Sequence, residues 1–124
     1  MTQEPYITKP TEERFSNFTM FPNCFHGIGA CISLHQHPND HIGVLPGGCI
    51  WKVVRIPPGE EPRVDIIDVA PLGVSLIGIP APWDHAFYYL GPSKLPPLAD
   101  PVQWCIFADY DKNGKFLPNP KVLG

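Results

Sequence analysis

Short apolar runs separated by turn residues make up most of the chain. The runs are rich in Val, Ile, Phe, Tyr and Trp, and Pro and Gly mark the breaks between them. Residues 52–56 and 64–69 partly alternate apolar with charged positions, as strands with one wet face do. The pattern predicts seven strands, at residues 28–34, 41–45, 49–56, 63–69, 74–79, 85–90 and 102–108.

No segment has the apolar stripe of an amphipathic helix. Residues 11–15, which follow Pro10, come nearest and predict one or two turns at most. Residues 1–24 are polar and irregular, so we expect an N-terminal arm that packs across the sheet or onto a partner. Residues 25–124 are expected to form an all-β domain, a small antiparallel jelly roll or β-barrel, because closure of the sheet removes exposed edges.

Composition adds limits on the class of protein. A chain of 124 residues that is 44% hydrophobic is long enough for one domain with its own core. The 17 prolines and 11 glycines interrupt apolar runs and form no low-complexity tract. Nine basic residues against 12 acidic ones give a net charge of −3, with no basic cluster, so we expect no nucleic-acid partner.

The sequence shows neither a secretory signal nor a membrane-spanning segment, and these two features bear on the cellular location. The polar N-terminus does not resemble a secretory signal, and no run reaches the about 18–20 apolar residues that cross a bilayer. The cysteines form no CxxC pair and are expected to be free, buried thiols in a reducing compartment. We therefore expect a cytoplasmic protein without a membrane partner. The four cysteines are Cys24, Cys31, Cys49 and Cys105.

Four of the five histidines form one spaced pattern. Three lie in Gly29-x5-His35-x-His37-x3-His41-x6-Gly48, and the fourth is His85. Neutral imidazole is the commonest metal ligand in proteins. Two histidines at positions i and i+2 of a strand point to the same face, so His35 and His37 are expected to lie side by side.

This pattern resembles the two sequence motifs of the cupin superfamily. The first motif reads G-x5-H-x-H-x3-4-E-x6-G, and His41 stands where the family usually has glutamate. In the second motif, Pro80 and His85 fit in register, whereas Pro82 and Tyr89 replace a glycine and an asparagine. The resemblance covers roughly residues 28–108.

The resemblance implies a β-barrel with a metal ion inside its mouth. The ligand set would be His35, His37, His41 and His85, which would hold one divalent ion: Fe, Zn, Ni, Co, Cu or Mn. Without the glutamate the ion keeps its full charge and becomes a stronger Lewis acid. Asp40 and Asp84 could orient imidazole N–H groups, although side chains adjacent to ligands on a strand would point the other way. The resemblance also implies a homodimer formed through the N-terminal arm.

Tyr89 is the candidate catalytic residue. Alternation along the strand puts Phe87 and Tyr89 on the same side as His85, where the Tyr89 hydroxyl could donate a proton or anchor substrate. His26 has no place in the motif and is expected to be structural or at the pocket rim. Residues 109–114 match half of a calcium loop, but position twelve is Pro120, so a hairpin turn at Asn113-Gly114 is the better interpretation.

The sequence therefore favours a metal-dependent cupin enzyme that acts on a small organic molecule. Two chemistries remain open. One is redox-neutral cyclase, isomerase or lyase chemistry, and the other is dioxygenation with Fe(II). The alternative is a cupin barrel without catalytic activity, serving as a ligand-binding or structural subunit.

Overall fold

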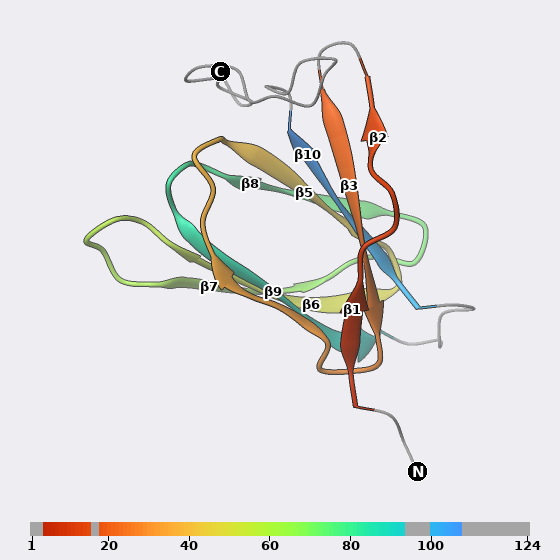
Figure 1. Ribbon diagram of the computed structural model, residues 1–124. Helices are drawn as coiled ribbons and strands as arrows, with labels where there is room; N and C mark the ends of the chain where they lie inside the picture. The colour runs from red at the N-terminus through yellow and green to blue at the C-terminus, as the bar shows by residue number, and fades with distance from the viewer. Residues whose placement is uncertain (1–3, 16–17, 94–99, 108–124) are drawn as a thin grey trace.

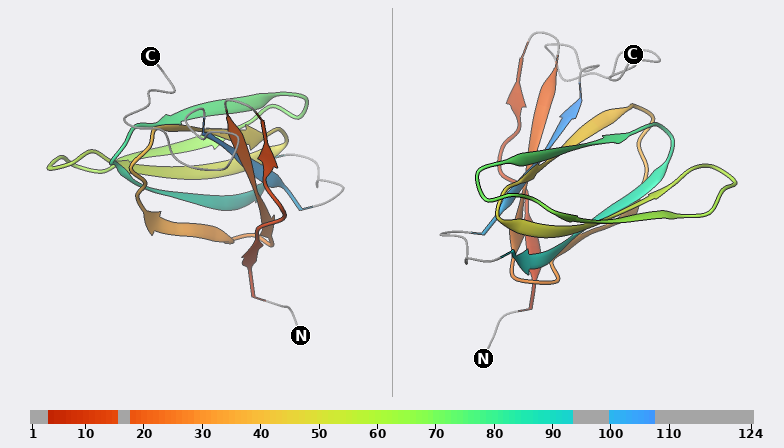
Figure 2. Two further views of the ribbon diagram at one scale, coloured as in Figure 1. Left: turned by 45° about the horizontal axis from the view of Figure 1, so that its top comes forward. Right: turned by 180° about the vertical axis from the view of Figure 1, so that it is seen from behind.

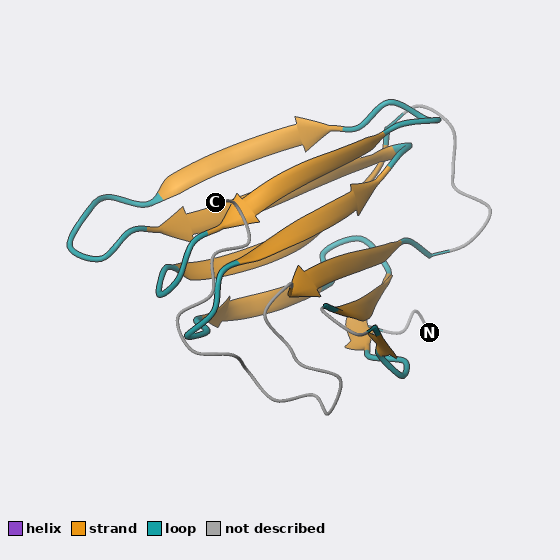
Figure 3. Ribbon diagram, turned by 90° about the horizontal axis from the view of Figure 1, so that it is seen from above, coloured by secondary structure: helices purple, strands orange, loops and turns teal. Residues whose placement is uncertain are grey.

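The computed structural model describes residues 4–15, 18–93 and 100–107, and in this part of the chain it contains ten strands and no helix (Figures 1 and 3). The strands are β1 (Tyr6–Thr8), β2 (Glu13–Arg14), β3 (Thr19–His26), β4 (Cys31–His35), β5 (His41–Pro46), β6 (Cys49–Ile56), β7 (Arg63–Asp68), β8 (Val74–Ile79), β9 (Asp84–Pro92) and β10 (Val102–Phe107). No helix that could span a membrane is therefore found in these residues.

The strands form two antiparallel sheets that face each other around the core (Figures 1 and 2). The larger sheet has the order β1-β3-β10-β5-β8, with β2 also paired to β3. The smaller sheet has the order β4-β9-β6-β7. Several neighbouring strands, such as β3 and β10 or β4 and β9, come from distant parts of the sequence, as in a jelly roll. The predicted all-β class is confirmed.

All seven predicted strands are present among the described residues, and most bounds agree to within two residues. The largest shift is at β4, which begins at Cys31 rather than at residue 28. Gly27 and Gly29 have φ angles of +91° and +95°, and the Ala30 N–H donates to the Gly27 carbonyl over 3.1 Å. These residues form a turn, because positive φ is incompatible with a regular strand.

The N-terminal segment is more regular than its sequence suggests. The short helix expected at residues 11–15 is wrong, because Glu13 and Arg14 form β2 and pair with Met20 and Thr19. The arm expected to be irregular contains β1, β2 and most of β3. The β3 strand was missed because its buried positions include Thr19 and Asn23, which break the apolar alternation.

The β3 strand also crosses the expected domain boundary between residues 24 and 25. It pairs with the whole of β10, from Thr19 opposite Phe107 to Cys24 opposite Val102. We therefore propose that the barrel begins at Thr19. The hairpin turn expected at residues 109–114 lies outside the described residues.

The core fills the space between the two sheets. Its largest members come from both, with Phe25 on β3 edge-to-face against Trp51 on β6 at a centroid distance of 4.9 Å. His41 and His85 are as deeply buried as these apolar side chains. The four cysteines are free, with Cys49 and Cys105 buried and the other two half-buried. A polar group of imidazoles is thus enclosed by an apolar barrel.

Candidate metal centre

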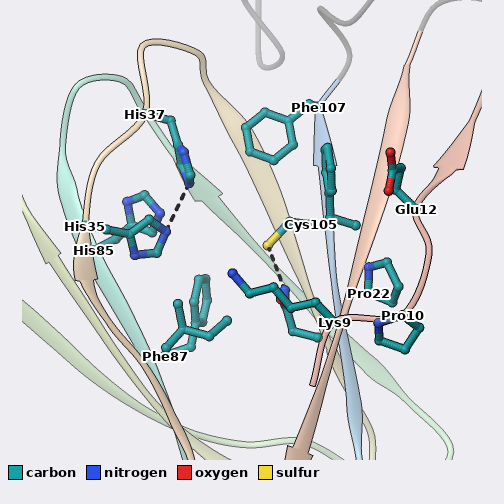
Figure 4. A pocket seen from close by; sticks show the side chains of 13 residues that line it. Lys9, Pro10, Glu12, Pro22, His35, His37, His85, Phe87, Cys105 and Phe107 are labelled. Carbon is teal, nitrogen blue, oxygen red and sulfur yellow. Dashed lines mark hydrogen bonds between the residues drawn. The ribbon is translucent and has the colours of Figure 1, made fainter. Parts of the chain in front are cut away.

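Strand pairing places two of the motif histidines opposite each other. The β4 and β9 strands are antiparallel, with His35 directly across from His85 and their ring centroids 4.2 Å apart. His37 lies beyond the end of β4, yet its Nε2 is 3.0 Å from Nε2 of His35 (Figure 4). One nitrogen from each of the three rings lies within 4.8 Å of the others.

The route by which His37 reaches this group differs from the expected one. We predicted that His35 and His37 share one strand face, but β4 ends at His35. Pro38, the residue after His37, has no N–H to donate to a strand ladder. The chain turns instead, and the loop brings the His37 ring back to its neighbours.

Backbone carbonyls orient two of the imidazoles. The Nδ1 of His35 is 2.7 Å from the Ser33 carbonyl, and the Nδ1 of His85 is 3.0 Å from the Trp83 carbonyl. In both cases the carbonyl belongs to the residue two positions earlier. A carbonyl can only accept, so the proton sits on Nδ1 and the Nε2 lone pair points into the site.

The aspartates do not take this orienting role in the described residues. The Asp40 carboxylate accepts the Ala81 N–H over 2.7 Å, which ties together the two loops next to the site. No hydrogen bond joins Asp84 to an imidazole in the part of the chain that the structure describes. Neither aspartate is therefore hydrogen-bonded to an imidazole among the described residues, which agrees with the alternative that side chains adjacent to ligands point the other way.

Burial holds His37, His41 and His85 neutral. Desolvation, followed by the proximity of other imidazoles, lowers the pKa of His37 to about 4. Burial lowers the pKa of His85 to about 4 and that of His41 to about 2. At neutral pH each of these rings is neutral and has one unprotonated nitrogen that can bind a cation, which is the state that metal binding requires.

His41 lies next to His37 and His85. It is 1% exposed, stacks on Phe107 at 4.5 Å, and has its ring centroid 4.9 Å from that of His85 and 5.2 Å from that of His37. It is not one of the three rings whose nitrogens lie within 4.8 Å of one another, and it does not line the cavity described below. The structure therefore places His41 next to the three-histidine group, whereas its role as a fourth ligand stays a prediction.

The donor atoms fit a divalent cation. Nε2 of His85 and both ring nitrogens of His41 are buried without a hydrogen-bond partner among the described residues. Such groups each cost about 1–3 kcal/mol unless something else satisfies them. Two nitrogens bound to one ion at about 2.0–2.1 Å lie roughly 3 Å apart when the bonds are near a right angle, which matches the 3.0 Å between His35 and His37.

The three histidines form one wall of a cavity of about 310 Å³ (Figure 4). Apolar side chains of Phe21, Ile32, Phe87 and Phe107 line much of the rest. The opposite wall is more polar and was not anticipated from the sequence. Its polar members are Lys9, Glu12, Asn23 and Cys105, which come from three separate segments and carry no shared sequence pattern.

Tyr89 does not line this cavity. Its side chain faces the barrel interior, as strand alternation predicts, but it belongs to the apolar core and packs against Trp51 at 5.4 Å. Burial raises the pKa of its hydroxyl. The Tyr89 hydroxyl is therefore not at this cavity, because sharing a face with His85 does not bring a residue four positions away to the same cavity.

His26 is structural, as expected. Its Nε2 lies 2.7 Å from Oγ1 of Thr8, its Nδ1 lies 3.0 Å from the Asp100 carboxylate, and its ring stacks on Tyr6. These contacts fasten β1 to β3. His26 is not among the residues that line the cavity.

The metal-free chain is expected to lose stability as the pH falls from about 7 to about 5. The folded-state pKa values of His37, His41 and His85 are depressed, so below their ordinary pKa of about 6.5 the unfolded chain binds protons that the native state refuses. Stability is thus present above pH 6.5 and decreases toward the folded-state pKa. Urea unfolding followed at several pH values measures the slope.

A His41→Phe variant provides the comparison. The phenyl ring keeps the stacking on Phe107 and removes one of the three imidazoles whose pKa is lowered. The slope of unfolding free energy against pH should decrease by about one proton. A wild-type profile that is flat over this range would contradict the prediction.

Two glycines of the sequence motif occupy positions that need them. Gly29 and Gly48 have φ angles of +95° and +77°, which non-glycine residues rarely adopt. Gly48 closes the turn between β5 and β6, and Gly29 precedes β4. They fix the two turns that flank the histidine segment.

Comparison with known proteins yields similarity of structure only. No protein-family model matches the chain, and no curated protein sequence matches it. An oxalate oxidase in complex with glycolate superposes with a TM-score of 0.59 at 16% identity, covering 91% of this chain and 54% of that one. A Lactobacillus farciminis oxalate decarboxylase formate complex gives 0.59 at 17% identity, covering 86% and 30%.

A third similar structure carries a different function. Peruvianin-I, a cysteine peptidase from Thevetia peruviana latex, superposes with a TM-score of 0.55 at 13% identity, covering 80% of this chain and 53% of that one. This chain thus spans about half or less of the length of these proteins. At such low identities the superpositions establish the fold alone, and the chemistry has to be argued from the site.

The oxalate oxidases and oxalate decarboxylases are cupins. Their superposition covers most of this chain, and the histidine motif lies where two strands of the barrel pair. The chain has the fold of the cupin superfamily.

Proposed function

We propose that the cavity binds one divalent metal ion through His35, His37 and His85 and uses it to act on a small organic molecule. One observation carries the proposal: three imidazoles converge, with Nε2 of His35 and His37 3.0 Å apart and Nε2 of His85 buried without a partner among the described residues. His41 is proposed as an additional ligand that would complete an all-nitrogen set.

Redox-neutral chemistry is the reaction class that we propose, as isomerisation, cyclisation or elimination. A divalent ion held only by neutral imidazoles would supply strong polarisation of a carbonyl or stabilisation of an enolate. The apolar walls formed by Ile32, Phe87 and Phe107 would keep water away from the reacting molecule. Dioxygenation is the second reaction class, since three histidines leave coordination positions open.

The alternative is a barrel that binds a ligand without catalysis. One observation favours it: the cavity offers few groups to move a proton. Among the described lining residues, the carboxylate of Glu12 is bonded to Arg14 over 2.7 Å, and Tyr89 lies elsewhere in the core. The cytoplasmic location agrees with four free thiols but, like the homodimer, remains a proposal.

Metal analysis of the purified chain tests the proposal. We expect one metal ion per chain, measured by inductively coupled plasma mass spectrometry after dialysis. Zinc would support the redox-neutral class, and iron with oxygen uptake would support dioxygenation. A chain that neither retains metal nor binds added Zn²⁺, Fe²⁺ or Mn²⁺ would contradict both enzyme classes and leave the ligand-binding alternative.

A further inference from the structure

The segment that joins β1 to β2, residues 9–12, runs along the polar wall of the cavity. We call it the N-terminal strap. Both flanking strands pair with β3, so the strap is held at its two ends. The contacts of His26 with Thr8 and Asp100 fasten the end next to Lys9. The strap is therefore a fixed part of the cavity and not a free terminus.

Lys9 extends from the strap into the cavity, toward the wall that carries the histidines (Figure 4). Its positive charge contributes to the lowered pKa of His37 on the far wall and acts on Cys105 on the near wall. Within the described residues Lys9 forms no ion pair. Glu12, the carboxylate among the lining residues, is already bonded to Arg14.

The rest of the cavity limits what could balance this charge. Much of the surface between Lys9 and the histidines is apolar, with Ile32, Phe87 and Phe107 among its members. The Asn23 amide donates to Gln103 over 3.0 Å, so its capacity is partly used. One ammonium beside apolar walls suits a singly charged group on an apolar body, whereas a phosphate dianion needs several donors.

We propose that Lys9 is a specificity-determining residue that holds the carboxylate of a small organic acid. The apolar body of the acid lies against the phenyl rings, and its other end faces His35, His37 and His85. The inference rests on the proposed function for what happens at the histidines, and it adds the class of substrate. Lys9 selects the anion through a charge-assisted hydrogen bond, and the apolar walls strengthen that bond by excluding water.

The test uses benzoate and its neutral analogue benzamide as probes of the full chain at neutral pH, first without metal and then loaded with zinc. Isothermal titration calorimetry gives the dissociation constants. We expect the metal-free wild type to bind benzoate about tenfold more tightly than benzamide, the effect of one hydrogen bond to a charged group. Lys9→Met should abolish this preference, and Lys9→Arg should retain most of it.

Lys52→Met is the matched control, because Lys52 lies on β6 with its ammonium 5.2 Å from the Tyr88 ring centroid and does not line the cavity. It should bind both probes as the wild type does. Equal binding of benzoate by wild type and Lys9→Met, or no binding of either probe at millimolar concentrations, would overturn the inference.

Zinc uptake separates this inference from the proposed function. Lys9→Met is expected to bind zinc as the wild type does, because this substitution leaves all three proposed ligands, His35, His37 and His85, in place. If zinc binds normally but the benzoate preference does not depend on Lys9, the anion site is wrong and the metal site stands. If the preference depends on Lys9 but no variant binds zinc, the proposed function is wrong.

Discussion

Replacing His85 by alanine is expected to reduce the affinity of the chain for zinc by more than about 100-fold, since even loss of an orienting partner costs 10–100-fold. His85 lies opposite His35 in the strand register, and its Nε2 is buried and directed by the Trp83 carbonyl. Without it, the β9 strand contributes no ligand to the site. Competition against a chromophoric zinc chelator measures the change.

His26→Ala is the control for that measurement. His26 contacts Thr8 and Asp100 and does not line the cavity, so this variant should bind zinc as the wild type does. Circular dichroism and a thermal melt of each variant establish that the barrel is intact. Unchanged zinc affinity in folded His85→Ala would contradict the assignment of the three-histidine site.

The same assay decides the role of His41. A fourth ligand predicts a loss of affinity in a folded His41→Phe variant, whereas a ring that only packs on Phe107 predicts none. Because phenylalanine preserves the stacked ring, the comparison isolates the nitrogen atoms from the packing.

Trp51→Ala is expected to lower the free energy of unfolding by about 3–5 kcal/mol, a large fraction of the about 5–15 kcal/mol typical of a small domain. Trp51 is fully buried on β6, pairs in register with Tyr89 and Ile67, and packs edge-to-face on Phe25 of the opposite sheet. Its removal leaves a cavity where the two sheets meet. Urea unfolding monitored by circular dichroism measures the loss.

Two further variants sharpen this result. Trp51→Phe should cost less than half as much, because it keeps an aromatic ring and removes an indole N–H that is buried without a partner among the described residues. Trp104→Ala, at a half-buried position on β10, should also cost less than Trp51→Ala. Equal losses for Trp51→Ala and Trp104→Ala would show that Trp51 does not hold the sheets together.

Local pattern was enough to predict the strands from β4 to β10. Apolar runs bounded by Pro and Gly identified the strands from β4 to β10 because burial of one face forces a period of two, and turn residues end each run. The apolar pattern does not predict the β3 strand, because the polar residues Thr19 and Asn23 occupy buried positions there. Asn23 is satisfied there by Gln103, a partner 80 residues away.

The sequence by itself determined the barrel class and the histidine motif, because strand periodicity and ligand spacing are local properties of the chain. Only the tertiary structure decided which rings converge. It joined His37 through a loop, placed His41 beside His37 and His85, and placed Tyr89 in the core. It also brought Lys9 to face the histidines, through the pairing of β1 and β2 with β3. Such contacts depend on strand pairings between distant segments, which no local pattern records.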